Sequence, residues 1–160
     1  FSTRKIKYSK EDYKNGFKLK LSSVLRNPTS MMTYLKALSY NENLYEYNKA
    51  NKEGFNEVVF LNIYGNIAEG ATSNIFIIKD KKIYTPKISD GILPGVVRNW
   101  VIKNFKVCEK HLDKEDLYSA DEVFITNSIL GIMKIVQFEE RSYSTSMVER
   151  IRSEYEQFII

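Results

Sequence analysis

The chain has 160 residues, of which 43% are hydrophobic and 13% aromatic, enough for one folded domain and too apolar for a disordered tail. It contains no run approaching the roughly 18 apolar residues of a membrane-spanning helix, and its single cysteine, Cys108, excludes an internal disulfide and favours a cytoplasmic location. Its 24 basic and 20 acidic residues give a net charge of +4, but the two signs are interleaved, which favours a solvated surface over a nucleic-acid groove.

The first part of the chain predicts a strand, a helix and a second strand. Polar and apolar residues alternate over 17–25, as in a half-buried strand, and the segment 27–30 breaks this pattern. A helix is expected from about 42 to 53, with Gly54 as its left-handed stop. The β-branched and aromatic residues of 57–61 predict a short strand that is buried on both faces.

The middle of the chain predicts a hairpin followed by a helix. Strands are expected over 74–78 and 83–85, with a turn at 79–82 and a stop at Pro86. After Pro94 the apolar period changes from two to about 3.6. This change predicts a helix over about 95–106 with an apolar face made by Val97, Trp100, Val101 and Phe105.

The last third adds a short helix, two strands and a terminal helix. Asp113 opens a short helix over 112–118, and strands follow over 122–125 and 132–138. The spacing of Ser146 and Glu149 fits a capping box of the terminal helix, and equally a position one turn inside it. The apolar face of this helix is made by Val148, Ile151, Tyr155, Phe158 and Ile159. Because strands dominate the middle and helices punctuate them, we expect one domain over residues 1–160, of α/β (α+β) class.

The segment 67–76 is unusually dense in special residues. A carboxylate, Glu69, stands beside Gly70 and is followed by Thr72, Ser73 and Asn74 before an apolar strand. Such a segment fits a tight turn in which the hydroxyl and amide groups bond to local backbone, and it also fits a functional site.

Two further segments have the composition of anion sites. Gly95 leads into a helix whose first backbone N–H groups are free, although glycine at an ordinary helix start explains the pattern too. The polar residues 126–128 follow an apolar strand, and their hydroxyls would suit phosphate oxygens, although a simple turn explains them as well. One cysteine and one histidine, His111, cannot build a Cys/His zinc site, so no metal is expected.

Together these segments resemble a known family. Glu69-Gly70 with Ser73-Asn74-Ile75-Phe76, then Tyr84-Thr85-Pro86, then Ile92-Leu93-Pro94-Gly95-Val96-Val97-Arg98, are similar in order and spacing to the class IV aminotransferases. These fold-type-IV enzymes of pyridoxal phosphate include branched-chain and D-amino-acid aminotransferases and 4-amino-4-deoxychorismate lyases. The resemblance includes Lys36-Ala37-Leu38-Ser39-Tyr40 and the segment 122–128, and it covers about residues 13–136.

The resemblance implies the residues that would act on the substrate and the cofactor ring. Lys36 would hold pyridoxal phosphate as an imine and later move protons at the substrate carbon. Glu69 would pair with the protonated pyridine nitrogen and keep the ring an electron sink. Tyr40 would lie near the phenolic oxygen of the cofactor, and Arg26 would have a supporting role.

Other residues would hold the cofactor in place. The resemblance implies that Ser73 and Asn74 support Glu69 and the ring, and that Leu93 packs on the ring face. The phosphate would be bound at the helix start and the strand end by Gly95, Val96, Val97 and Ser128. Two departures from the family pattern are local: Val97 stands where many relatives have threonine, and Met133-Lys134-Ile135 replaces an apolar-Pro-apolar stretch.

The resemblance also implies a fold, an activity and an assembly. The chain is similar to the large C-terminal domain of the D-amino-acid aminotransferase-like architecture, without the small N-terminal domain. It lacks the glycine-rich stretch that usually follows the lysine in branched-chain enzymes, which favours 4-amino-4-deoxychorismate lyase, giving 4-aminobenzoate and pyruvate in folate biosynthesis. A branched-chain or D-amino-acid aminotransferase is the alternative, and a non-catalytic binding module is a third reading, which the presence of Lys36 and Glu69 disfavours. The expected partners are a small amino substrate and a second copy in a homodimer.

Overall fold

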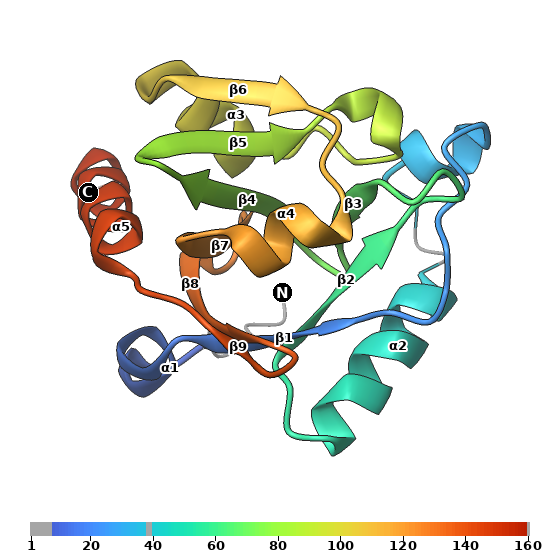
Figure 1. The fold of residues 1–160 in the computed structure, drawn as a ribbon, viewed down its shortest axis with the longest axis horizontal. Coiled ribbons are helices and arrows are strands. Elements are labelled where there is room, and N and C mark those ends of the chain that lie inside the picture. Colours follow the sequence, from blue (N-terminus) through green and yellow to red (C-terminus); the bar gives the residue numbers. More distant parts are fainter. Residues whose placement is uncertain (1–7, 38–39, 160) are drawn as a thin grey trace, which may run out of the picture.

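The computed structural model describes residues 8–37 and 40–159 (Figure 1). Its helices and strands follow one another in this order: α1 (Lys10–Asn15), β1 (Phe17–Leu21), the 3-10 helix η1 (Met31–Tyr34), α2 (Asn41–Lys52), β2 (Glu57–Leu61), β3 (Ile67–Gly70), β4 (Asn74–Lys79), β5 (Lys82–Pro86), the 3-10 helix η2 (Ile88–Asp90), α3 (Val96–Asn104), β6 (Val107–Lys110), α4 (Lys114–Ser119), β7 (Glu122–Asn127), β8 (Gly131–Phe138), β9 (Arg141–Ser142) and α5 (Ser146–Phe158).

One curled sheet forms the framework of the domain. Its strands have the order β3-β2-β1-β8-β7-β4-β5-β6, and β9 pairs with β8. Strand β1 runs parallel to β2 and β8, and β5 runs parallel to β6, whereas β7 is antiparallel to both β4 and β8. The backbone N–H of Ile67 in β3 donates to the carbonyl of Leu112, just beyond β6, at 2.6 Å. The two edges of the sheet therefore approach each other, and the sheet curls into an incomplete barrel (Figure 1).

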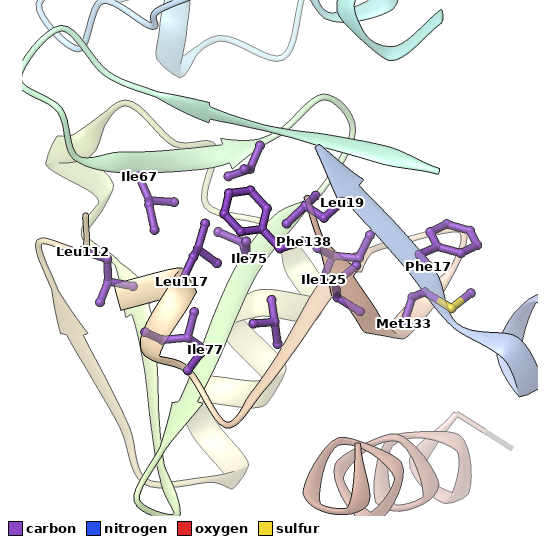
Figure 2. Packing of buried hydrophobic residues seen from close by; sticks show 14 of the residues in the cluster. Phe17, Leu19, Ile67, Ile75, Ile77, Leu112, Leu117, Ile125, Met133 and Phe138 are labelled. Carbon is purple, nitrogen blue, oxygen red and sulfur yellow. The ribbon is translucent and has the colours of Figure 1, made fainter. Parts of the chain in front are cut away.

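The inside of the curl holds the main hydrophobic core (Figure 2). Alternate residues of β4 and β7 point into it, and Leu117 of α4 packs against them and helps to fill the interior. Fully or nearly fully buried members of this core include Leu19, Val59, Ile67, Ile75, Ile77, Val123, Ile125, Met133, Ile135 and Phe138.

Helices cover the outside of the sheet. Helices α3 and α5 pack on the outward residues of β4, β5, β7 and β8, where the rings of Phe76 and Phe124 stack at a centroid distance of 4.6 Å. Helix α2 covers β2, and its Ala50 packs against Val58 and Phe60. Strand β2 is thus buried on both faces, because Val59 points into the curl while its neighbours point to α2.

Most of the elements expected from the sequence are confirmed. Helix α2 ends just before Gly54, which has a φ of +86°, and the hairpin turn between β4 and β5 has positive φ at Asp80 and Lys81. Asp113 caps α4 through a capping box with Asp116. Within the described residues, no helix has both the length and the apolar character to cross a membrane.

Three expectations are corrected. The first strand ends at Leu21 and not at residue 25, because the Ser22 hydroxyl accepts from the N–H of Val24 and donates to Glu46, which turns the chain. Ser146 forms no capping box: it is the first residue of α5, and its hydroxyl donates to Glu122. At the end of α5, Phe158 contacts the Trp100 ring but remains 67% exposed, and Ile159 beside it is 60% exposed, so these two residues are not buried with the rest of the apolar face.

Candidate active site

A cleft opens where several strands and the start of α3 meet. Asn74 at the start of β4 pairs with Thr126 near the end of β7, so the antiparallel register brings segments far apart in the sequence to one end of the sheet. Two cavities, of about 360 and about 590 Å³, lie here. They adjoin because four residues line both: Lys36, Tyr40, Glu69 and Leu93.

The smaller cavity collects the residues singled out from the sequence. All ten expected cofactor contacts line it: Lys36, Tyr40, Glu69, Ser73, Asn74, Leu93, Gly95, Val96, Val97 and Ser128. Arg26 lines the larger cavity. Leu38 and Ser39, which belong to the motif around Lys36, lie outside the described residues. The structure thus brings the ten residues together, and their individual roles stay predictions.

Glu69 is the buried acid of the cleft. Strand β3 pairs with β2 through a β-bulge: three residue steps of β3, from Ile67 to Gly70, lie opposite two residue steps of β2. Such a bulge changes the direction in which side chains point. One Glu69 oxygen accepts from the backbone N–H of Leu93 at 2.9 Å, and the other lies 3.5 Å from the Arg26 guanidinium. Burial raises the pKa of Glu69 to about 7, although Arg26 and the Leu93 N–H oppose the shift.

Asn74 joins the carboxylate to the segment before α3. Its amide nitrogen donates to the carbonyl of Leu93 at 2.7 Å and to Glu69 at 3.3 Å. A side chain at Gly95 would overlap the Asn74 amide oxygen, so a larger residue at this helix start would have to displace the amide that bonds Leu93 and Glu69. Asn74 is therefore hydrogen-bonded to Glu69, and its role toward a cofactor stays a prediction.

Ser73 has a different partner from the one expected. Its hydroxyl donates to Glu57 at 3.0 Å and not to Glu69, because the turn between β3 and β4 directs it toward β2. Glu57 was not identified from the sequence as a functional residue, yet it is 2% exposed and accepts hydrogen bonds from the whole 71–73 turn. The only indication in the sequence is a carboxylate at the edge of an apolar strand, and its partners are 14 to 16 residues further along.

The other side of the cleft offers hydrogen-bond donors. Gly95 is the N-cap of α3 and has an extended backbone and no side-chain cap, so the first N–H groups of this helix face the cleft without a side-chain partner. The Asn127 side chain accepts from the N–H groups of Ile129 and Leu130, both at 2.8 Å, and this turn exposes Ser128. Thr126 also lines the cavity, and its buried hydroxyl has no hydrogen-bond partner among the described residues.

Lys36 and Tyr40 line both cavities of the cleft. Lys36 is exposed within the cleft, and its positive charge acts to lower the pKa of Glu69. Burial raises the pKa of Tyr40, the charge of Glu69 adds to this shift, and Arg26 opposes it. An amine, a phenol and a carboxylate thus meet in one cleft, which can bind a molecule that carries both a basic nitrogen and an anionic group.

The curled sheet of mixed α/β class is that of the fold-type-IV enzymes. Residues 1–138 match the family described as amino-transferase class IV, and the chain belongs to this family. It is 36% identical over 135 residues to the aminodeoxychorismate lyase of Bacillus subtilis, covering 81% of this chain and 46% of that protein. It is 33% identical over 138 residues to the branched-chain-amino-acid aminotransferase of Pseudomonas aeruginosa, covering 82% and 45%.

Solved structures agree with this assignment. An aminotransferase from Brucella abortus bound to the cofactor PLP superposes with a TM-score of 0.83 at 30% identity, covering 89% of this chain and 54% of that one. The chain spans about half the length of the curated relatives that it matches. Its similarity to these relatives therefore concerns about half of each of them.

Proposed function

We propose that this chain is the cofactor-binding large domain, over residues 1–160, of a pyridoxal-phosphate-dependent enzyme. One observation carries the proposal: Lys36 and the buried Glu69 line one cavity together with the donors at Gly95 and Ser128. The Brucella abortus aminotransferase with the same fold is bound to PLP, which supports this cofactor.

The donors in the cleft fit the chemistry of the cofactor. Among the described residues, the hydroxyl of Thr126 has no hydrogen-bond partner and no side chain caps the start of α3, so these groups and the exposed Ser128 suit phosphate oxygens. Glu69 offers a carboxylate for a pyridine nitrogen, and the ion pair would be stronger in this buried setting than in water. When bound, pyridoxal phosphate supplies an electron sink for bonds broken at the substrate carbon.

Each of these residues would then have its own role toward the cofactor and the substrate. Lys36 would bind the cofactor covalently and, once displaced by the amino substrate, hold and move the proton at the substrate carbon. Glu69 would hold a proton on the pyridine nitrogen, and Arg26 at 3.5 Å favours the ionised form of this carboxyl. Asn74 orients Glu69, and Leu93 would pack on the ring.

Among activities of the family, we propose 4-amino-4-deoxychorismate lyase, which releases pyruvate and leaves 4-aminobenzoate. The segment after Lys36 lacks the glycine-rich stretch usual in branched-chain enzymes, and the lyase of Bacillus subtilis is a relative at 36% identity. Branched-chain amino transfer is the second candidate, because the Pseudomonas aeruginosa relative carries that name.

Two measurements on the full-length protein test these proposals in turn. Titration with pyridoxal phosphate should give a saturable change in the absorbance spectrum, and a spectrum that stays the sum of protein and free cofactor would contradict cofactor binding. Pyruvate release from 4-amino-4-deoxychorismate, compared with amino transfer from leucine or a D-amino acid to a 2-oxo acid, then separates lyase from aminotransferase. Absence of both reactions in a protein that binds the cofactor would favour a non-catalytic module.

A further inference from the structure

Glu57 is a buried carboxylate that the chemistry above does not use. It is 2% exposed, and none of the described lysines or arginines lies within ion-pair distance of it. Burial raises its pKa, and hydrogen bonds to the carboxylate act in the opposite direction. A buried carboxylate without a cation is costly unless donors surround it, so its partners show what it holds.

The donors come almost entirely from one turn. Oε1 of Glu57 accepts from the N–H of Ala71 at 3.1 Å, and Oε2 accepts from the hydroxyls of Thr72 and Ser73, each at 3.0 Å. The N–H of Thr72 reaches Oε2 at 3.4 Å, and the N–H of Val58 completes the set. One carboxyl on β2 thus fixes three consecutive residues of the link between β3 and β4.

This 71–73 turn connects the walls of the cleft. On one side, the Asn43 amide donates to the carbonyl of Ala71 at 2.7 Å, and Asn43 lies in the first turn of α2, just after Tyr40. On the other side, the Asn127 amide donates to the carbonyl of Thr72 at 3.1 Å, and the oxygen of Asn127 shapes the turn that exposes Ser128. The strand that enters the turn carries Glu69.

We propose that Glu57 is the positioning residue of the cleft: its carboxyl fixes the 71–73 turn and, through Asn127, the turn that carries Ser128. The link to cofactor affinity rests on the proposed function, whereas the link between the two turns does not. Glu57 lines neither cavity, so it acts on the shape of the cleft through Thr72 and Asn127. Its charge also acts to raise the pKa of Glu69, and the exchange readout below does not depend on that charge.

A matched control exists at the far end of the same sheet. Glu122 is also a buried carboxylate, and it accepts from the Ser146 hydroxyl and from the N–H groups of Met147 and Val148, at 2.9 to 3.0 Å. It pairs with Ile78, at the opposite end of β4 from Asn74, and lines neither cavity of the cleft. Glu57→Gln and Glu122→Gln therefore remove similar hydrogen bonds, one near the cleft and one far from it.

The first readout is amide hydrogen exchange of the full-length protein without cofactor. In Glu57→Gln we expect exchange to quicken about tenfold at Ala71 and Thr72 and also at Ile129 and Leu130, whose N–H groups donate to Asn127. Glu122→Gln should leave these amides at the wild-type rate. If the amides of Ile129 and Leu130 exchange in Glu57→Gln at the same rate as in the wild type, the proposal is overturned, whether or not the protein binds a cofactor.

The second readout is affinity for pyridoxal phosphate. Glu57→Gln should weaken it about tenfold, whereas Glu122→Gln should lower the melting temperature with no more than a twofold change in affinity. If Glu57→Gln does not fold, Thr72→Val replaces it, since it removes one hydroxyl donor to Glu57, and Thr72→Ser should restore the wild-type value. Wild-type affinity in Glu57→Gln, or in Thr72→Val where that variant replaces it, would overturn the positioning role, while a wild type that binds no cofactor would instead overturn the proposed function.

Discussion

At the scale of single residues, Glu69 is governed by two opposing influences. Burial favours its neutral form and raises its pKa to about 7, while Arg26 and the N–H of Leu93 favour its charged form. A bound cation near its carboxyl would stabilise the charged form further. Its ionisation near neutral pH is therefore set by what occupies the cleft.

The raised pKa of Glu69 gives a prediction for stability without cofactor. Folding favours its protonated form, so its stabilising contribution is complete below pH 4.5 and is lost as the pH rises through about 7. The free energy of unfolding should therefore fall between pH 5 and pH 8 by about 2.5 kcal/mol more in the wild type than in Glu69→Gln. Urea unfolding of both proteins at pH 5 and pH 8 measures this difference. If the free energy of unfolding falls equally in both proteins, Glu69 is ionised in the free cleft.

The same substitution tests the chemical role. Glu69→Gln keeps the shape of the side chain and can still accept from the N–H of Leu93, so we expect the fold and much of the cofactor affinity to remain. Turnover of the full-length enzyme should fall by roughly a hundredfold or more, because the pyridine nitrogen loses its charged partner. Turnover within a few-fold of the wild type would remove Glu69 from this role.

At the scale of elements, one helix start and one strand end meet at the cleft. The free N–H groups at Val96 and Val97 and the hydroxyl of Ser128 line the same cavity, and oriented N–H groups attract anions. These groups are expected to recognise the phosphate of the cofactor and not its ring.

Ser128→Ala separates the two kinds of recognition. Affinity for pyridoxal phosphate should fall roughly tenfold, since a hydrogen bond to a charged group is lost, while affinity for pyridoxal should not change. Ser119→Ala, at the exposed end of α4, is the control. An equal loss for both ligands would mean that Ser128 supports the cleft as a whole.

The periodicity of apolar residues predicted most of the strands and helices. The elements that it missed have physical reasons for being missed. Strand β3 was missed because its four residues include glycine and a buried carboxylate and carry a bulge, so no period of two is visible. Edge strand β6 has mostly half-exposed and exposed residues, and α1 buries none. For such elements the sequence contains only local indications, such as the capping box of Ser9 and Asp12.

In the site, the resemblance to the family identified residues that line the cleft. The partners of their side chains depend on how the curled sheet brings distant segments together. Glu57 could not be assigned from the sequence, because its role depends on donors that the fold brings to it from the 71–73 turn. Ser73 was assigned to the wrong carboxylate for the same reason. The family motifs predicted which residues lie near the cleft. The hydrogen-bond partners of their side chains could be assigned only from the structure.

At the scale of the whole molecule, the larger cavity is lined by side chains that stay exposed. Leu25, Met32 and Leu35 line it and are 50 to 60% exposed, and Met31 beside them is 77% exposed. Apolar groups gathered at one opening promote association.

We therefore expect this chain to form at least a dimer. Light scattering at micromolar concentration should give a mass of about twice 18.7 kDa or more. Met31→Lys with Leu35→Lys should shift the mass toward the monomer, and Ile63→Lys with Tyr64→Lys, at two exposed positions that line neither cavity, serves as control. A wild-type chain that scatters as a clean monomer would contradict the expected homodimer.

The central claim is that Lys36 bonds the cofactor covalently while Glu69 faces it across the cleft. Borohydride reduction of the full-length protein loaded with pyridoxal phosphate, followed by peptide mass mapping, tests it directly. We expect one label, on the peptide that contains Lys36, and loss of that label in Lys36→Ala. Label spread over surface lysines such as Lys52 and Lys81, or unchanged labelling in Lys36→Ala, would contradict the account.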